Sequence, residues 1–538
     1  MPLTLNNTLS RREQMFAPIE PGVVRFYTCG PTVYDFAHIG NFRSFLAADL
    51  LRRWLESPLC ERVDSDGKPE GHAFGEGGYD VAHVMNITDV GHMTDDDDAD
   101  GGGEDKMEQA RQRLLQDKKS GKLPDGATGA QGSTLDPNNP RDIAAFYADA
   151  FLEDAKKLGL KVAIEAESDP SLMPRPTRII PQMLAMICEL LERGHAYIAS
   201  DGVCYFDTQS FPEYGNLSGN TLDAIRSGAG GRVSDEAQAV KKHPADFMLW
   251  KPDRRHIMRW DPTRELAGDE RSLEVLKKHP LGEGYPGWHI ECSAMARERL
   301  GERIDIHSGG EDNIFPHHEC EIAQSRCATG EPSFSNFWFH PRFLQVEGEK
   351  MSKSKGNFFT ARDLFAKGFS PAAVRLSLIN THYRTNANFT QQDLKDAQRR
   401  IERWSAFVEA GDTSSHTGDR NRAVAERFAM ELNGDLNIAG ALGVINGWVR
   451  DTDAPTRADA DLMREFDRVL GVLELDRGGD ASAGEDDAEI DALVAARTQA
   501  KKDKNWAEAD RIRDELTDRG VEVTDTPDGP VWKRTVSL

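Results

Sequence analysis

The apolar run Val23–Tyr27 is followed closely by a long stretch whose apolar residues recur at helical spacing. The segment between the two, Pro31–Asn41, therefore falls at a strand-to-helix turn, where backbone N–H groups can face a phosphate group. In this segment Gly40 would let a phosphate chain or a planar base approach the backbone closely, while His38 and Asn41 can donate hydrogen bonds to developing negative charge. His-Ile-Gly-Asn alone fits an ordinary turn with a packed histidine, but the Cys-Gly-Pro-Thr-Val-Tyr-Asp in front of it favours a ligand site.

A second strand is expected over His83–Asp89, which ends in a polar turn. The order strand, helix, strand predicts an α/β fold with a Rossmann-like parallel sheet. Ligands of such sheets bind beyond the carboxyl ends of the strands. This rule makes four residues site candidates, namely Cys29, Thr32, His38 and Thr88.

A lysine-bearing segment, Lys350–Asn357, lies more than three hundred residues further along the chain. Lys350 and Lys353 would meet a triphosphate when such a loop closes, and their charge would stabilise the transition state of phosphoryl chemistry. The alternative is a solvated basic loop. With Lys-Met-Ser-Lys-Ser intact, the pairing of this segment with the first turn predicts an ATP site.

A third group of residues has the character of a metal site. Its members are Cys29, Cys292, His307, Asp312, His317, His318, Cys320 and Glu321. Pro316 suits the first turn of a helix, on which His317 and Glu321, four apart, would share one face, and Cys320 could join them. This mixture of ligands suits zinc better than magnesium or calcium. Spacing alone leaves a zinc site and buried cysteines with surface histidines equally open, and it does not choose between Cys320 and Glu321.

Composition narrows the class of protein. A chain of 538 residues is long enough for roughly three to four domains. It has no apolar stretch of membrane-spanning length, and residues 1–20 do not read as a secretory signal. Seven scattered cysteines are typical of reduced thiols and of a cytoplasmic protein. The net charge of −24 argues against broad, sequence-independent binding of nucleic acid but leaves room for a local RNA contact.

The rest of the chain divides by pattern. Helical spacing is expected over 145–158, 183–191, 394–408 and 422–475, and a strand over 203–207. Residues 476–489 have the composition of a linker, beyond which two helices (490–502 and 507–516) and a hairpin around Pro527-Asp528-Gly529 form a small separate module. Loops or loop insertions are expected at 56–79, 95–104, 118–141 and 254–284, and the third of these is expected to be mobile.

Six motifs together closely resemble the cysteinyl-tRNA synthetases, a family of class I aminoacyl-tRNA synthetases. They are Phe26–Asp35, Asn86–Asp89, Asp246–Lys251, Pro286–Ser293, Phe315–Glu319 and Lys350–Asn357, and the likeness covers most of the chain. The resemblance implies one Zn²⁺ per chain held by Cys29, Cys292, His317 and Glu321, which settles the choice against Cys320. It further implies that ATP, with Mg²⁺, activates L-cysteine for transfer to cysteine tRNA.

The resemblance also implies roles for individual residues. Catalysis would rest on Lys353, Lys350, His38 and Asn41, and ATP would contact His38, Gly40, Asn41 and Lys353. The amino acid would bind among Gly30, Thr32, Thr88, Trp288, His307 and Asp312, although Trp288 could equally be a core residue. A thiolate binds zinc far better than a hydroxyl does, so a metal explains how cysteine is separated from serine.

By the same resemblance the chain divides into five parts. These are the first half of a catalytic domain (1–114), a connective insertion (115–250), the second half with the zinc ligands and the lysine loop (251–390), a helical bundle that contacts the tRNA stem (391–480), and a small anticodon-binding domain (490–538). The last part offers basic and stacking groups of the right type at Lys501, Lys502, Lys504, Trp506, Trp532, Lys533 and Arg534, although a basic helix and a buried tryptophan are equally compatible with them. A monomer is expected.

Two other hypotheses stay open on the sequence alone. A related ligase of thiol biosynthesis transfers cysteine to an amino sugar, but it lacks the C-terminal module that residues 490–538 resemble. A zinc- and RNA-binding protein with a synthetase fold and no catalysis is the other alternative. Intact Lys350 and Lys353 weigh against it.

Overall fold

A four-stranded parallel sheet lies at the centre of the structure, a computed structural model that describes residues 2–90, 106–120, 127–220, 240–352, 356–419, 421–503, 505–518, 521–526 and 529–534. Its strands are β3 (Val23–Thr28), β4 (Asp80–Met85), β9 (Ile304–Ser308) and β10 (Ser335–Phe339), in the order β10-β9-β3-β4. Every pair is parallel, with Tyr27 opposite both Val84 and His307. The predicted α/β fold is confirmed, and two halves of the chain that are far apart in sequence share one sheet.

Helix α1 (Ile39–Glu56) connects β3 to β4. A capping box fixes its start, since the His38 ring accepts a hydrogen bond from the Asn41 N–H and the Asn41 side chain accepts one from the His38 N–H. The helix is buried on most sides because it contacts the sheet, α13 (Pro371–Ile379) and α17 (Arg457–Leu470). The start of α1 is thereby held at the carboxyl end of β3.

The insertion between β4 and β9 has two parts. Helices α2 (Lys106–Ser120), α3 (Pro140–Lys157) and α4 (Lys161–Glu165) pack on the core that contains α1. Helix α5 (Ile180–Glu192), strands β5 (Ala196–Ile198), β6 (Cys204–Phe206) and β7 (Phe247–Pro252), and helix α10 (Trp288–Leu300) surround a second core, and strand β8 (Gly284–Pro286) pairs with β7. Helix α11 (Glu319–Thr329) lies between β9 and β10, outside this insertion, and packs on the same core. The expected helices in 145–158 and 183–191 and the expected strand near 203–207 are confirmed by α3, α5 and β6.

Two of the expected loop insertions contain helices instead. Residues 254–284 form α8 (Pro262–Glu265) and α9 (Glu270–Lys278), because Asp261 and Asp269 cap them and Val275 and Leu276 pack into the second core. Likewise α2 extends to Ser120 and α3 begins at Pro140, so 118–141 is only partly a loop. The described part of the insertion at 56–79 lacks helices and strands, as expected, whereas 95–104 lies outside the described residues.

The remainder of the chain is mostly helical. Strands β11 (Leu344–Val346), β12 (Glu349–Lys350) and β13 (Ala387–Phe389) form a small sheet beside α12 (Ala361–Ala366) and α13. A bundle follows, made of α14 (Gln391–Asp412), α15 (Arg422–Asn433), α16 (Ile438–Asp451) and α17. At the other end of the chain, β1 (Thr4–Asn7) pairs with β2 (Arg12–Met15).

The prediction of a linker over 476–489 is wrong, because α18 (Leu473–Lys502) includes these residues in one continuous helix. The segment is rich in Gly, Ala and Asp, which by itself favours a linker, but the helix is packed on both sides of it, at Leu473 and at Ile490 and Val494, and continues between them. Helix α19 (Trp506–Asp518) and the hairpin β14 (Val521–Thr526) and β15 (Gly529–Arg534) then complete the C-terminal unit. Pro527 and Asp528 of the expected turn lie outside the described residues.

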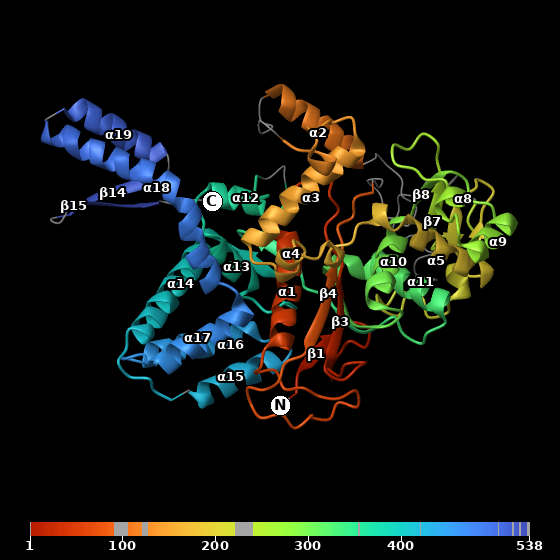
Figure 1. Ribbon diagram of the computed structural model, residues 1–538, viewed down its shortest axis with the longest axis horizontal. Helices are drawn as coiled ribbons and strands as arrows, with labels where there is room; N and C mark the ends of the chain where they lie inside the picture. Colours follow the sequence, from red (N-terminus) through yellow and green to blue (C-terminus); the bar gives the residue numbers. More distant parts are fainter. Residues whose placement is uncertain are drawn as a thin grey trace.

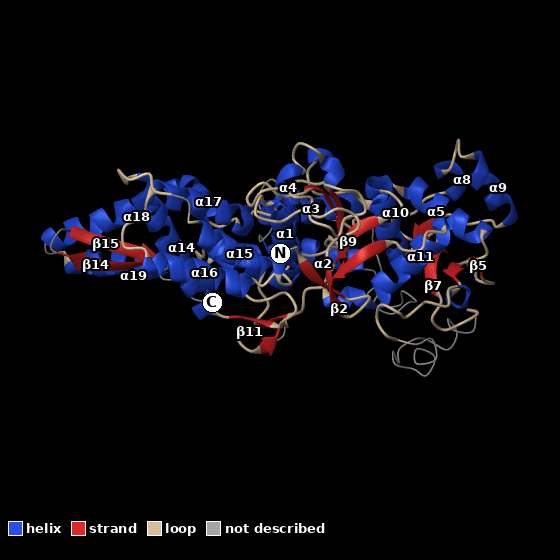
Figure 2. Cartoon of the chain, turned by 90° about the horizontal axis from the view of Figure 1, so that it is seen from below, coloured by secondary structure: helices blue, strands red, loops and turns tan. Residues whose placement is uncertain are grey.

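The C-terminal unit and the insertion lie at opposite ends of an elongated molecule. Figure 1 shows α18 and α19 projecting beyond the bundle, with α8 and α9 at the far side of the central sheet. Figure 2, seen from below, shows the same separation between β14 and β15 at one end and β5 and β7 at the other. None of the described helices is long and apolar enough to cross a membrane.

Candidate active site and metal centre

A cavity of about 430 Å³ opens where β3 and β4 end. It brings together ten of the predicted site residues, namely Cys29, Gly30, Thr32, His38, Asn41, Thr88, Trp288, Cys292, Asp312 and His317. These residues come from the turns after two strands, from α10 and from the chain that leads into α11. A larger cavity of about 910 Å³, beside residues 209–220, contains none of the predicted residues, so chemistry and not size selects the candidate site.

The other predicted residues that the structure describes do not line this cavity. His307 and Glu321 are fully buried in contact with each other and with the metal cluster, and Lys350 is exposed on β12. Gly40 faces the lysine segment, because a Cβ added to it would lie 2.7 Å from Met351 Cε. Lys353 lies outside the described residues.

The start of α1 meets the chain that directly follows the lysine segment. His38 pairs with Thr360 in an antiparallel bridge, and the Ile39 N–H donates to the Phe359 carbonyl at 3.0 Å. Because the Nδ1 atom of His38 accepts the Asn41 N–H, the ring carries its proton on Nε2. His38 therefore combines a structural role, as helix cap, with an N–H that can act as a donor in the cavity that it lines.

Four buried side chains converge at the inner end of the cavity. The ligand atoms of Cys29, Cys292, His317 and Glu321 all lie within 4.8 Å of one another. The two sulfur atoms are 3.7 Å apart, and Glu321 Oε1 lies 3.5 Å from Cys29 Sγ and 3.1 Å from His317 Nε2. Two thiols, an imidazole and a carboxylate are the donor set that zinc accepts.

A second, overlapping set also has metal-site geometry. Cys29, His307, His318 and Glu321 satisfy the same 4.8 Å limit. Glu321 Oε2 lies 3.0 Å from His307 Nε2, and Cys29 Sγ lies 3.3 Å from His318 Nε2. Cys29 and Glu321 are common to both sets, so the cluster can offer a metal more donors than the four that the sequence singled out.

Cys320 takes no part in either set. Its sulfur lies 3.3 Å from the Tyr214 hydroxyl, and burial raises the pKa of its thiol well above the ordinary value. The local backbone explains the difference. Residues 314–318 form an irregular turn with an extended Phe315 that leads into α11. His317 and His318 lie on the same side of the helix as Glu321, whereas Cys320, the residue before Glu321, points about 100° away around the helix axis.

The side chains of this cluster shift one another's pKa values. Burial alone would raise the pKa of the Cys292 thiol, but a hydrogen bond with Cys29 and the nearby His317 lower it to about 6. Burial likewise opposes ionisation of Glu321, yet His307 and His317 lower the pKa of its carboxyl group to about 2. Burial disfavours a charged His317, yet Cys292 and Glu321 raise its pKa to about 10. The cluster therefore combines the anionic side chains of Cys292 and Glu321 with a protonated His317. A divalent cation can take the place of that proton and neutralise the anions.

Aromatic and histidine side chains surround the cluster. Trp288 stacks on His317, with ring centres 4.4 Å apart, and His289 Nδ1 lies 2.9 Å from His317 Nδ1. Trp338 stacks on His307 at 4.6 Å. The sequence reasoning did not assign His289 or Trp338 to the site, although His289 stands three residues before Cys292 and offered a signal.

His318 and His340 form the remaining side of this shell. His318 Nδ1 lies 2.7 Å from His340 Nε2, whose ring in turn contacts the Thr8 hydroxyl at 2.7 Å. Burial lowers the pKa of His318 well below the ordinary value, and burial with the charge of His307 lowers that of His340 to about 3. Both rings are therefore neutral at physiological pH. No pattern in the sequence pointed to His340.

Comparison with known proteins identifies the family. The pattern of the family described as tRNA synthetases class I (C) catalytic domain matches residues 15–63 and 72–399, and that of the cysteinyl-tRNA ligase anticodon binding domain matches 484–532. A cysteine–tRNA ligase of Salinibacter ruber is 39% identical over 98% of both chains, and one of Solibacter usitatus is 40% identical over 99% of this chain and 100% of its own. The chain belongs to the cysteinyl-tRNA synthetases. A methionyl-tRNA synthetase of Mycobacterium tuberculosis, solved with methionyl-adenylate, is 13% identical with a TM-score of 0.46 and covers 84% of this chain and 88% of its own.

Membership of the cysteinyl-tRNA synthetases agrees with the position of the cluster. The catalytic match spans both halves of the sheet and includes Cys29, Cys292, His317 and Glu321. The second match begins within α18 and includes α19 and the hairpin. The resemblance stated from the motifs is therefore confirmed at the level of the family.

Proposed function

We propose that this protein joins L-cysteine to its cognate tRNA in two steps. The cysteine carboxylate attacks the α-phosphorus of ATP and releases pyrophosphate, and a ribose hydroxyl of the terminal adenosine then attacks the carbonyl carbon and releases AMP. The observation that carries this proposal is the single cavity of about 430 Å³ that Cys29, Cys292 and His317 share with His38 and Asn41. One side of that cavity suits a thiol and the other a phosphate chain.

In the first step the residues would act by stabilising charge. A carboxylate is already a nucleophile, so the reaction needs no strong general base. His38, through Nε2–H, and Asn41 would donate hydrogen bonds to the α-phosphate, while Gly40 leaves room for the nucleotide. Lys350 and Lys353 would balance the charge of the leaving pyrophosphate, together with the Mg²⁺ that accompanies ATP.

Recognition of the substrate sulfur would rest on Cys29, Cys292, His317 and Glu321, which we propose hold one Zn²⁺. The burial of all four and the lowered pKa of Cys292 support this assignment. Bound zinc favours a thiolate over a hydroxyl ligand, so serine would be rejected by a factor on the order of 10⁴. Trp288, stacked on His317, would hold that ring in place and close one wall of the amino-acid pocket.

The remaining contacts to cysteine would come from the strand ends. Gly30 donates its N–H to the Asn86 side chain at 2.8 Å, and Thr32 pairs with Thr88 across the cavity floor. We propose that this floor supports the substrate backbone and that Asp312, at the cavity wall, receives the ammonium group. His307 would act from below the cavity by orienting Glu321.

The tRNA would span the molecule. We propose that the bundle from 391 to 480 contacts the stem and that residues 490–538 read the anticodon, since the latter overlap a match to an anticodon-binding domain. A monomer suffices, because the modules needed for both tasks lie in one chain. The seven cysteines are all buried and free of disulfides, which supports a cytoplasmic location.

Cysteine-dependent ATP–pyrophosphate exchange and charging of cysteine tRNA test the proposal. Zinc-replete protein should do both. Loss of both reactions would contradict the proposal and favour a non-catalytic zinc and RNA-binding protein. Exchange without tRNA charging, combined with transfer of cysteine to an amino sugar, would favour the thiol-biosynthesis ligase instead.

A further inference from the structure

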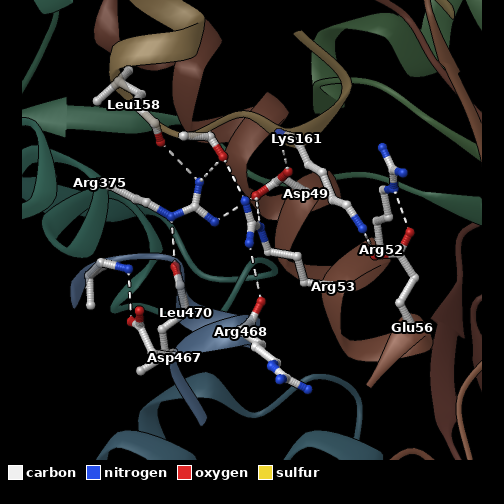
Figure 3. A network of polar contacts seen from close by, with 12 residues as sticks. Asp49, Arg52, Arg53, Glu56, Leu158, Lys161, Arg375, Asp467, Arg468 and Leu470 are labelled. Atoms are coloured by element: carbon white, nitrogen blue, oxygen red, sulfur yellow. Dashed lines mark hydrogen bonds and ion pairs between the residues drawn. The ribbon is translucent and has the colours of Figure 1, made fainter. Parts of the chain in front are cut away.

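A buried network of charged groups lies outside the cavity, where four parts of the chain meet. Its centre is Arg375 on α13, whose side chain is 0% exposed. The guanidinium donates to Asp49 Oδ2 on α1 at 2.5 Å, to the Leu470 carbonyl at the end of α17 at 2.6 Å, and to the carbonyls of Leu158 and Gly159 after α3 at 3.0 and 3.2 Å. Figure 3 shows the fork of Arg375 between these groups.

Asp49 joins the same elements from the other side. Besides Arg375, its carboxylate accepts a hydrogen bond from Arg53 at 2.7 Å and one from the Lys161 N–H at 2.8 Å. Arg53 also donates to the Arg468 carbonyl at 3.1 Å and to the Gly159 carbonyl at 2.8 Å. Two arginines and one carboxylate thus tie the middle of α1 to the end of α17.

The end of α17 is also the start of the arm that leads to the C-terminal unit. Asp467 accepts hydrogen bonds from the N–H groups of Val472 and Leu473, each at 2.9 Å, and so fixes the first turn of α18. Gly471 makes the sharp turn between the two helices with φ of +65°, and a Cβ there would lie 3.2 Å from the Arg375 guanidinium. Helix α18 then extends for 30 residues, about 45 Å, toward α19 and the hairpin.

Both helices held by Arg375 lead back to the ATP motif. Helix α1 begins at His38 and Asn41, about 15 Å along its axis from Asp49. Helix α13 follows α12, whose N-cap Thr360 pairs with His38. The network therefore lies between the base of the C-terminal arm and the two segments that frame the nucleotide side of the cavity.

We propose that Arg375 is a positioning residue that couples the engagement of the C-terminal arm by tRNA to the placement of His38 and Asn41. This inference rests on the proposed function. A planar guanidinium that donates to three main-chain carbonyls and one carboxylate holds four segments in fixed relation. A displacement of the α17–α18 turn must move α1 with it or break the fork, so a shift of that turn on tRNA binding would be passed to the start of α1.

The variant Arg375→Lys tests the coupling, because lysine keeps a charge next to Asp49 but cannot reach all four groups. We expect cysteine-dependent ATP–pyrophosphate exchange without tRNA to stay within about twofold of wild type. The ratio of the charging efficiency (kcat/KM) with normal cysteine tRNA to that with a tRNA in which one anticodon nucleotide is replaced should fall by about fivefold or more. A fall of this size is typical for the loss of coupling between two sites.

A control and a second variant separate coupling from stability. Glu56→Gln alters a carboxylate on the same helix that pairs with Arg52 and Lys161 but not with the α17–α18 turn, and it should leave the ratio unchanged. Asp467→Asn weakens the hydrogen bonds that fix the first turn of α18 but leaves the Arg375–Asp49 pair intact. It should lower the ratio as Arg375→Lys does.

Two results would overturn the inference. One is an unchanged ratio in both variants. The other is an equal fall of exchange and charging, which marks a general loss of stability. A wild-type protein that activates cysteine but never charges tRNA would instead contradict the proposed function itself.

Discussion

The substitution Glu321→Gln tests the metal centre most directly, because this carboxylate is common to both overlapping ligand sets. Its oxygens lie 3.0 Å from His307 Nε2 and 3.1 Å from His317 Nε2, and the side chain is fully buried. Glutamine keeps the shape and one carbonyl oxygen but removes the charge. It also replaces one acceptor oxygen by an N–H donor, so the variant removes the charge and one of the two acceptor atoms of the cluster.

The lowered pKa of Glu321 gives the size of the effect in metal-free protein. A carboxyl pKa of about 2 in place of the ordinary 4.5 corresponds to about 3 kcal/mol of stabilisation. Because the folded pKa is the lower one, this stabilisation is complete above pH 4.5 and is lost as the pH falls toward 2. At pH 7 the glutamine variant should therefore unfold more easily by up to about 3 kcal/mol.

Metal affinity should fall more steeply than stability. Groups that only orient a metal ligand are worth about 10- to 100-fold in affinity, so a residue that supplies a ligand atom should cost about 100-fold or more. Cys320→Ser is the matched control, since Cys320 adjoins Glu321 in sequence but contacts Tyr214 instead of the cluster. It should keep zinc affinity within about threefold of wild type.

The assay is zinc content of the purified variants by elemental analysis, followed by competition with a chelator of known affinity and by urea unfolding of the metal-free forms. Wild type and Cys320→Ser should hold one zinc per chain, and Glu321→Gln should hold much less. The reasoning is refuted if Glu321→Gln retains one equivalent at wild-type affinity, or if Cys320→Ser loses as much metal as Glu321→Gln does.

Three further predictions concern the cavity and its metal. Lys353→Ala should abolish cysteinyl-adenylate formation and leave zinc content unchanged, and equal exchange activity in the variant would contradict the role given to this lysine. Gly30→Ala should lower exchange by about tenfold or more, because its Cβ would lie 1.8 Å from the Asn86 carbonyl oxygen. Gly443→Ala, at an exposed position of α16 with open space around it, should be neutral or slightly stabilising. Zinc affinity of metal-free protein should rise with pH up to about 10, because His317, whose pKa is raised to about 10, and Cys29, whose thiol pKa burial raises well above its ordinary value, must lose their protons to bind metal. Calorimetry in buffers of different ionisation enthalpy measures the protons released, and a pH-independent affinity would exclude this release.

Local patterns were sufficient for much of the fold. The apolar run that forms β3 and the helical spacing of α1, α3 and α5 are properties of neighbouring residues, so the parallel sheet and its ligand edge could be predicted. The prediction of a linker over 476–489 failed because it rested on the composition of that segment alone. Composition reports whether a segment can bury itself in a core, but the helix continues through 476–489 because α18 is packed on both sides of it, at Leu473 and at Ile490 and Val494.

The sequence by itself determined which chemistry is present, because residue types and short motifs are local: a histidine-glycine turn, a lysine segment, and a set of thiols, imidazoles and carboxylates. Only the tertiary structure decided which of them meet. Glu321 and Cys320 are adjacent on α11, and because consecutive residues of a helix point about 100° apart, the first faces Cys29 while the second contacts Tyr214. Side chains 263 residues apart come within 3.7 Å because parallel strands and their crossover helices, folded as one unit, bring distant segments to the same sheet edge.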